Sequence, residues 1–437
     1  MHRIHFRTET DREWSDVNAV KTVRFWLIPT VVVALLMSLL SALYIGGIVD
    51  PKKSLHDFPV ALVNSDEGDT LPSGQPADFG RQIADGLVSG IDSSKVDLQP
   101  MGIAQAQDGM ASGDLYGAIV VPSDFTKRMV ILAEAGVVSG EVDKPVITVL
   151  TNPRAGTLAS SLVTTIGDEA LDAANTTVGQ QVTKTVGDTV TEPISGAAAL
   201  TLAQPIDVIV TPYNPLPDGT GLGLAAFYYA LLLLLAGFTG AMVVSALVDG
   251  ALGFTPTEYG PFFKHRQTAA ISRLQTMFVK WVIMVGIGLI VSALYLWIST
   301  SLGMPSPHSL LLWMYGALAI AAVGITATSI VSVFGTAGLL INLILFIVLG
   351  LPSAGATIPL EATPRIFGWL AQFEPMHQVF VAVRSILYFD ARADAGLTHG
   401  LSATFVGLSI GLTFGAVTVW YYDRKGLARR NSATPVS

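Results

Sequence analysis

The chain has 437 residues, of which 51% are hydrophobic and 13% are charged. Soluble domains carry about 25% charged residues, so half of the usual charge is missing. The mean hydropathy of +0.55 is too high for an ordinary soluble globular chain. These values exclude a cytosolic enzyme and a disordered protein. The net charge of −8 argues against a nucleic-acid partner, which requires a basic face. The absence of cysteine excludes disulfides and cysteine-ligated metals.

Apolar segments account for the missing charge. About 20 apolar helical residues cross a bilayer core of about 30 Å, and five runs reach this length: Phe25–Val49, Leu222–Val248, Met277–Ile298, Leu310–Val333 and Leu401–Tyr422. The run Ala337–Leu351 has 15 residues, roughly 22 Å of helix, and crosses only with little tilt or in a thinned bilayer. We therefore expect a polytopic α-helical membrane protein with six spans. The first run is a retained anchor or a cleaved signal peptide, and its length favours the anchor.

Basic residues predict the orientation, because they collect on the cytoplasmic side of membrane proteins. With six spans, the two terminal tails, the connection between spans two and three and the start of span three, with Lys280, share one side. This side has 13 basic and seven acidic residues. The opposite side has 12 basic and 26 acidic residues. We therefore expect a multi-pass protein of the cell membrane with both termini in the cytoplasm.

This topology divides the chain into five parts. Residues 1–24 and 423–437 are cytoplasmic tails, and residues 25–49 are the first transmembrane helix. Residues 50–221 are an extracytoplasmic domain between spans one and two. Residues 222–422 are a five-span membrane domain.

Residues 50–221 alternate short β-type runs with helical stretches, which favours an α/β fold. The predicted strands are Phe58–Val63, Lys95–Met101, Tyr116–Pro122, Pro145–Leu150 and Ile206–Thr211. The predicted helices are Phe79–Val88, a helix from Ser123 or Asp124 to Ala135, and Thr157–Val190, which is long enough to project as a stalk.

The acidic sequence after the first strand has two interpretations. Asn64, Asp66 and Gly68 fit a tight turn, whereas the cluster of Asp66, Glu67 and Asp69 suits a cation. The spacing differs from that of an EF-hand loop, which continues to a terminal Glu, so the turn is favoured. The seven histidines are scattered and form no His-Glu-x-x-His motif, so no metal site is expected.

Two short motifs are better explained by structure than by chemistry. Gly407–Gly411 matches the Gly-x-Ser-x-Gly of a nucleophile elbow, but it lies inside an apolar span, where small residues favour helix contacts. Asn175-Thr-Thr177 matches a glycosylation acceptor, and a chance match is favoured. No catalytic residue is therefore assigned, and the chain is not expected to be an enzyme.

Residues 352–400 are predicted to enter the membrane without crossing it. Pro352, Pro359, Pro364 and Pro375 prevent one straight span, although much of the segment is apolar. Irregular backbone at membrane depth must be covered by protein or line a cavity. We therefore expect two short re-entrant helices that are broken at Pro375, or an interfacial amphipathic helix.

The embedded polar residues of this region are Glu374, His377 and Arg384. Ionisable groups at membrane depth need partners, so Glu374 and Arg384 are predicted to pair across the two short helices. Asn342 is the one strong polar side chain within spans two to five and is expected to make an interhelical hydrogen bond. The lack of carboxylates in these spans argues against ion-coupled transport and suits a hydrophobic substrate.

Three segments resemble known families. Val60-Ala-Leu-Val-Asn-Ser-Asp-Glu-Gly68 and Leu115-Tyr-Gly-Ala-Ile-Val-Val-Pro-Ser-Asp-Phe125 resemble two elements of the YhgE/Pip extracellular domain. Residues 374–390 resemble a segment of the related group that includes fungal nitrosoguanidine-resistance proteins. Both groups resemble type 2 ABC exporter permeases, in which one span, a large outer domain and five spans follow in order. The long coiled-coil insertion of larger YhgE/Pip members is absent.

The resemblance implies a separate ABC ATPase, because the chain has no Gly-x-x-x-x-Gly-Lys-Ser/Thr motif of its own. In the resembled exporters, the stretch equivalent to residues 249–276 includes a short helix that docks on the ATPase. The residues predicted to make this contact are Glu258, Tyr259, Lys264, Arg266 and Arg273. The alternative is a basic loop held against anionic lipid head groups.

The leading hypothesis is a permease-like subunit of an ABC-type exporter for a lipid-like or amphipathic substrate. It implies a homodimer in the lipid bilayer, a partner ATPase, and no cofactor in this chain beyond the ATP that the partner binds. The alternative is a membrane-anchored receptor, secretion scaffold or cell-envelope protein that acts through its extracytoplasmic domain. A standalone drug-resistance transporter is a weaker third reading.

Overall fold

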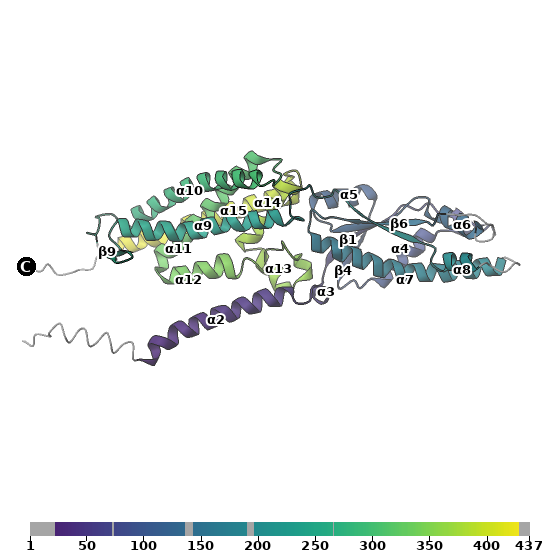
Figure 1. Cartoon of the computed structure of the whole chain (residues 1–437), viewed down its shortest axis with the longest axis horizontal. Helices are drawn as coiled ribbons and strands as arrows, with labels where there is room; N and C mark the ends of the chain where they lie inside the picture. The colour runs from purple at the N-terminus through teal and green to yellow at the C-terminus, as the bar shows by residue number, and fades with distance from the viewer. Residues whose placement is uncertain (1–21, 72–73, 136–142, 190–195, 265, 428–437) are drawn as a thin grey trace, which may run out of the picture. The chain divides into compact units, whose positions relative to one another are not determined.

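The computed structural model describes residues 22–71, 74–135, 143–189, 196–264 and 266–427 (Figure 1). Much of both predicted tails, His265, and the side chain of Tyr259 lie outside the described part. Contacts between Cα atoms divide the chain into two compact units, Met1–Val49 and Asp50–Ser437, and each is described by itself.

The first unit contains one long helix, α2 (Val23–Ile48), with Pro29 inside it. Nearly all of its side chains are exposed, and they are apolar on every side. A helix that is apolar all round requires an apolar environment. It is one of five described helices that are long and apolar enough to cross a membrane.

The second unit begins with the short helix α3 (Pro51–Ser54). A five-stranded mixed sheet follows, in the order β4-β1-β5-β6-β7. The strands are β1 (Phe58–Asn64), β4 (Val96–Pro100), β5 (Gly117–Val121), β6 (Val146–Thr151) and β7 (Asp207–Pro212). Strand β1 is parallel to both β4 and β5, β6 is antiparallel to β5, and β7 is parallel to β6. Between β1 and α4 in the sequence, β2 (Asp69–Thr70) and β3 (Pro76–Ala77) form a separate small antiparallel pair. The five-stranded sheet of the predicted α/β domain therefore contains both parallel and antiparallel strand pairs.

Helices cover both faces of the sheet. One core contains side chains of α4 (Phe79–Gly90), α6 (Phe125–Ala135) and α7 (Thr157–Thr189) together with the sheet. On the other face, α5 (Ile103–Ser112), which the sequence did not predict, packs through Ala106 and Met110 against Ala61 and Ala118. The central strands β1 and β5 are apolar on both faces because both faces are covered there.

The long helix α7 is not a free stalk over its described length. It packs on the sheet, on α4 and on α8 (Gly196–Ala203). Asn175 of α7 is 8% exposed, donates to the Ile206 carbonyl at 2.9 Å and accepts from the Ile206 amide at 3.0 Å. This structural role explains Asn175 without glycosylation.

A helical bundle follows. Its helices are α9 (Leu224–Ala251), α10 (Arg273–Ser301), α11 (Ser309–Phe334), α12 (Ala337–Leu343) and α15 (Thr398–Arg424). All except α12 are long and apolar enough to cross a membrane. The α12 helix continues through one π-helical turn, η1 (Ile344–Val348), so the fifth predicted span is the shorter apolar helix Ala337–Val348.

Helix α11 is the centre of the bundle and packs against α9, α10 and α15. Small residues permit these contacts: a Cβ atom on Gly237 of α9 would lie 2.7 Å from the Cβ of Val323. Gly411, the last glycine of the Gly-x-Ser-x-Gly sequence, packs directly on Thr326 of α11. That motif therefore serves a helix contact, as small residues do in apolar bundles.

The segment between η1 and α15 contains η2 (Leu360–Ala362), α13 (Arg365–Ala371), α14 (Pro375–Tyr388) and η3 (Ala393–Leu397). Two short helices meet at a break just before Pro375, as the sequence predicted. The proline is the first residue of α14, where its missing N–H costs nothing.

Candidate functional site

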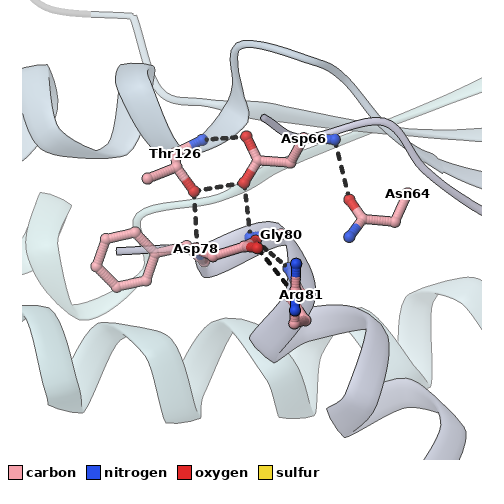
Figure 2. A network of polar contacts seen from close by, with 7 residues as sticks. Asn64, Asp66, Asp78, Gly80, Arg81 and Thr126 are labelled. Carbon is pink, nitrogen blue, oxygen red and sulfur yellow. Dashed lines mark hydrogen bonds and ion pairs between the residues drawn. The ribbon is translucent and has the colours of Figure 1, made fainter. Parts of the chain in front are cut away.

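The turn after β1 is held together by Asp66 (Figure 2). One carboxylate oxygen of Asp66 accepts the Gly80 amide at 3.0 Å and the Thr126 hydroxyl, and the other accepts the Thr126 amide at 2.9 Å. Gly80 and Thr126 lie in the first turns of α4 and α6. An anion is favourable there because both helix dipoles point their positive ends at it.

The remaining residues of this motif also shape the turn. Asn64 accepts the Asp66 amide at 3.1 Å. Gly68 has φ of +73°, and a Cβ atom there would lie 2.9 Å from the Ala77 carbonyl oxygen. These contacts favour the turn interpretation of Asn64, Asp66 and Gly68. Among the described residues, no group of three or more His, Cys, Asp or Glu is placed to hold a metal ion.

The junction between the α/β domain and the bundle is a polar network. The Tyr116 hydroxyl donates to Glu361 of η2 at 2.7 Å, and its ring stacks on Phe58. Burial raises the pKa of Tyr116 well above its ordinary value, and the neighbouring Glu361 carboxylate raises it further. Tyr116 therefore stays protonated and remains a donor.

Arg154 and Arg384 cross the same junction. Arg154 Nη1 donates to the Tyr388 carbonyl of α14 at 2.8 Å. Arg384 Nη1 of α14 donates to the Ala155 carbonyl at 3.2 Å, and its guanidinium lies 5.4 Å from the ring centre of Phe380 and 5.5 Å from that of Phe389. These two arginines bind backbone carbonyls reciprocally across the boundary.

The predicted pair of Glu374 and Arg384 is wrong. Both residues belong to one continuous stretch, with Glu374 capping α14 through the amides of Met376 at 2.7 Å and His377 at 3.1 Å. Ten residues of helix separate the pair by about 15 Å. His377 Nδ1 instead lies 2.9 Å from the Ala354 carbonyl oxygen, so Glu374 and His377 fix the start of α14.

The interhelical hydrogen bond expected of Asn342 is present. The fully buried Asn342 donates from Nδ2 of α12 to the Ala327 carbonyl of α11 at 3.0 Å. This bond is consistent with a packing role.

The stretch of residues 249–276 forms a hairpin rather than the short helix implied by the resemblance. Strands β8 (Thr257–Tyr259) and β9 (Phe262–Lys264) are antiparallel. Phe262 and Phe263 are 75% and 68% exposed. Glu258, Lys264 and Arg266 are exposed as well, so this tip combines aromatic and charged surface.

The base of the hairpin is tied to the bundle. Lys280 Nζ of α10, which is fully buried, lies 2.9 Å from Asp249 Oδ1 of α9. The Asp423 carboxylate of α15 accepts the amides of Arg273 at 3.2 Å and Leu274 at 3.0 Å at the start of α10. Arg273 also donates from Nε to the Leu427 carbonyl at 2.7 Å, so it anchors the bundle.

Comparison with known proteins gives one family. The model described as "Protein of unknown function (DUF3533)" matches residues 29–411. The chain belongs to this family. No curated protein matches it. The match does not confirm the YhgE/Pip or nitrosoguanidine-resistance groups that the sequence motifs resemble.

One solved structure is similar over part of the chain. It is a crystallised domain of a candidate ABC type-2 transporter from Thermotoga maritima MSB8, with 14% identity and a TM-score of 0.23. The match covers 36% of this chain and 85% of that domain. A likeness of this extent carries no argument about the activity of the DUF3533 protein.

Proposed function

We propose that this DUF3533 protein is the permease-like membrane subunit of an ABC-type exporter for a lipid-like or amphipathic substrate. The observation that carries the proposal is the position of α9. At its first turn, the Ala226 amide donates to the Tyr388 hydroxyl of α14 at 3.2 Å. In its last turn, Asp249 pairs with Lys280, and the exposed hairpin follows. One helix therefore joins the junction network to an exposed docking tip.

In this proposal the chain crosses the membrane six times, with both termini in the cytoplasm and the α/β domain outside. The distribution of basic residues supports this orientation. The short apolar helix Ala337–Val348 is about 18 Å long and crosses only where the bilayer is thinned. Helices α13 and α14 are the re-entrant pair on the outer side.

The hairpin is the proposed contact for a separate ATPase. Aromatic side chains at the centre of an interface supply most of its binding energy, and charges at the rim supply orientation. Phe262 and Phe263 fit the first role, and Glu258, Lys264 and Arg266 fit the second. Arg273 is assigned to the bundle in this proposal, because its amide and its Nε bond to Asp423 and Leu427.

The proposed mechanism transmits ATPase closure along α9. The partner ATPase binds ATP, and its closure within a homodimer of permease subunits moves the hairpin. The buried Asp249–Lys280 pair couples this movement to α9 and α10. Tyr388 then transmits it to α14, which shifts against the α/β domain and releases the substrate on the outer side.

The test is ATP hydrolysis by the full-length protein co-purified with its partner. We expect Phe262→Ser/Phe263→Ser to abolish both co-purification and ATPase stimulation. Leu302→Ser is a matched control, because Leu302 is 83% exposed at the opposite end of α10 and lies outside the hairpin. If no Walker-motif ATPase co-purifies with the native chain, or if the double variant keeps full stimulation, the proposal fails.

A second candidate function is a receptor or scaffold that acts through the α/β domain. The edge strand β7 favours it, because Ile209 and Val210 are 50% and 41% exposed on a strand that can pair with another chain. Residues 50–221 alone lack Ala362, which belongs to their core, so the test needs the full chain. Cellular activity that survives Phe262→Ser/Phe263→Ser but is lost in Ile209→Lys would favour the receptor.

A further inference from the structure

The α/β domain contains a groove of about 710 Å³ between α4, α7 and the edge strand β4. Ordinary ligand pockets span roughly 300–1,000 Å³. The floor of the groove is apolar and buried, with Ile83 and Leu87 of α4, Val96 of β4, and Leu162 and Val178 of α7. The groove is therefore large enough and apolar enough for a hydrocarbon chain.

Small residues keep the groove open. Gly86 and Gly90 line it from α4, and a Cβ atom on either glycine would meet nothing within 4 Å. Ala170 and Ala174 line it from α7, four residues apart and thus on one helix face. Larger side chains at these positions would fill the space between the helices.

The groove is also long. Its lining on α7 runs from Leu162 to Gln181, which is about 28 Å of helix. One leaflet of a bilayer is about 15 Å of hydrocarbon, half of a core of about 30 Å. An extended acyl chain of a membrane lipid fits along this wall.

Charges of both signs surround one part of the groove. Lys52 Nζ lies 3.5 Å from Glu169 Oε1, and Lys95 Nζ lies 3.9 Å from Asp92 Oδ2. The Phe58 amide donates to the Lys95 carbonyl at 3.0 Å, which brings the segments that precede β1 and β4 together. Exposed ion pairs of this length are weak, so a ligand can replace either partner.

Asp85 of α4 also lines the groove, so its lining has two ammonium groups and three carboxylates. This mixture of charges matches a head group that carries one phosphate and one ammonium. Lys52 is also the fourth residue after Ile48, where the apolar helix α2 ends. The charged part of the groove is thus joined by a short stretch of chain to a segment that is apolar enough to cross a membrane.

We propose that the groove binds a single zwitterionic phospholipid. One acyl chain lies between α4 and α7, the phosphate contacts Lys52 and Lys95, and the ammonium contacts Asp92 and Glu169. This inference rests on the proposed function, because the groove would be the site that receives the exported lipid. Binding itself requires no ATPase.

The test uses the full-length protein in micelles of an uncharged glycoside detergent that contain a phosphatidylethanolamine with a photoactivatable acyl chain. We expect cross-links to map by mass spectrometry to α4 and α7. Ala174→Trp fills the groove and should reduce these cross-links at least fivefold. Gln180→Trp places the same side chain on an exposed position of α7 outside the lining and should leave them unchanged. Cross-links that are absent from α4 and α7, or equal in Ala174→Trp and wild type, would overturn the proposal.

The head-group assignment has its own test. The variant Lys52→Glu/Lys95→Glu should lose most of the phosphatidylethanolamine cross-linking, and unlabelled phosphatidylethanolamine should compete better than anionic phosphatidylglycerol. Equal competition by the two lipids contradicts a zwitterionic ligand. The hairpin variant Phe262→Ser/Phe263→Ser should bind lipid normally, so failure of lipid binding and failure of ATPase coupling are distinguishable.

Discussion

The two ends of α9 are built differently. At its first turn, α9 contacts Tyr388, beside a junction where Tyr116, Arg154 and Arg384 each bond across the boundary between the α/β domain and the bundle. At its last turn, a buried ion pair is followed by a hairpin with two exposed phenylalanines. The junction end is fixed by many contacts, whereas the hairpin end is fixed at its base and open at its tip.

The junction end of α9 is therefore held in place, whereas the tip of the hairpin at its other end is free to move. Segments with few buried contacts open at low cost in free energy, and moving parts are drawn from them. The hairpin tip fits this description, and the junction network does not. In the proposed mechanism, a push on the hairpin tip is passed to the bundle at Asp249 and Lys280, and the junction network resists it.

Breaking the ion pair at the hairpin base should have the largest effect. Lys280→Met leaves the Asp249 carboxylate in a largely buried place without its charged partner, and losing one partner of a buried pair costs about 3–5 kcal/mol. We expect a clear fall in the thermal unfolding temperature of the protein in detergent.

Two variants sharpen this result. Lys264→Met makes the same substitution at an exposed position of the hairpin and should change the free energy of unfolding by no more than about 0.5 kcal/mol. Asp249→Leu/Lys280→Met removes both charges and should recover most of the lost stability. If Lys280→Met lowers the free energy of unfolding no more than Lys264→Met does, the Asp249–Lys280 pair does not hold the hairpin base.

At the junction, Tyr116→Phe should have an intermediate effect. The ring still stacks on Phe58, but Glu361 loses the donor 2.7 Å away. Glu361 is partly buried, and a hydrogen bond to a charged group contributes about 1.5–3 kcal/mol. Hydrogen exchange at η2 and at the start of β5 should accelerate about tenfold for each 1.4 kcal/mol lost.

The control for this junction bond is Tyr228→Phe, because Tyr228 is 56% exposed on α9. It should leave exchange at η2 unchanged. A double-mutant cycle with Glu361→Gln measures the coupling of the pair. Additive effects of the two substitutions would show that Tyr116 and Glu361 do not stabilise the junction together.

The sequence predicted the local elements of this structure better than its long-range contacts. Strands β1 and β5 are apolar runs that end at turn residues, and both were predicted. The hairpin was missed, although the Gly-Pro pair between Tyr259 and Phe262 is a turn signal. The resemblance to exporters favoured a helix there and outweighed this local pattern.

Contacts between distant residues had no local signal. Asp249 and Lys280 are 31 positions apart, and Lys280 was interpreted as one of several basic residues near the membrane surface. Glu374 and Arg384 were paired because both are ionisable within an apolar segment, but the helix between them keeps them apart. The bonds from Arg154 and Arg384 to backbone carbonyls require the folded junction, and composition cannot reveal them.

The smallest effect is expected from Arg392, on the exposed edge of the same junction. Its guanidinium lies 3.0 Å from Asp108 of α5 and 2.6 Å from Asp394. Exposed pairs contribute little and are screened by salt. Arg392→Gln should lower the thermal unfolding temperature slightly at low ionic strength, and the difference from wild type should vanish in 1 M salt, where the Debye length is about 3 Å.

The matched control for Arg392 is Arg81→Gln, because Arg81 also forms an exposed pair, with Asp78 3.0 Å away, but entirely within α4 and its cap. Both substitutions should be equally mild if the exposed edge adds nothing specific to the junction. A much larger loss in Arg392→Gln, which persists in high salt, would mean that the edge pair with Asp108 helps to fix the junction. The restraint at this end of α9 would then extend beyond Tyr116, Arg154 and Arg384 to the surface.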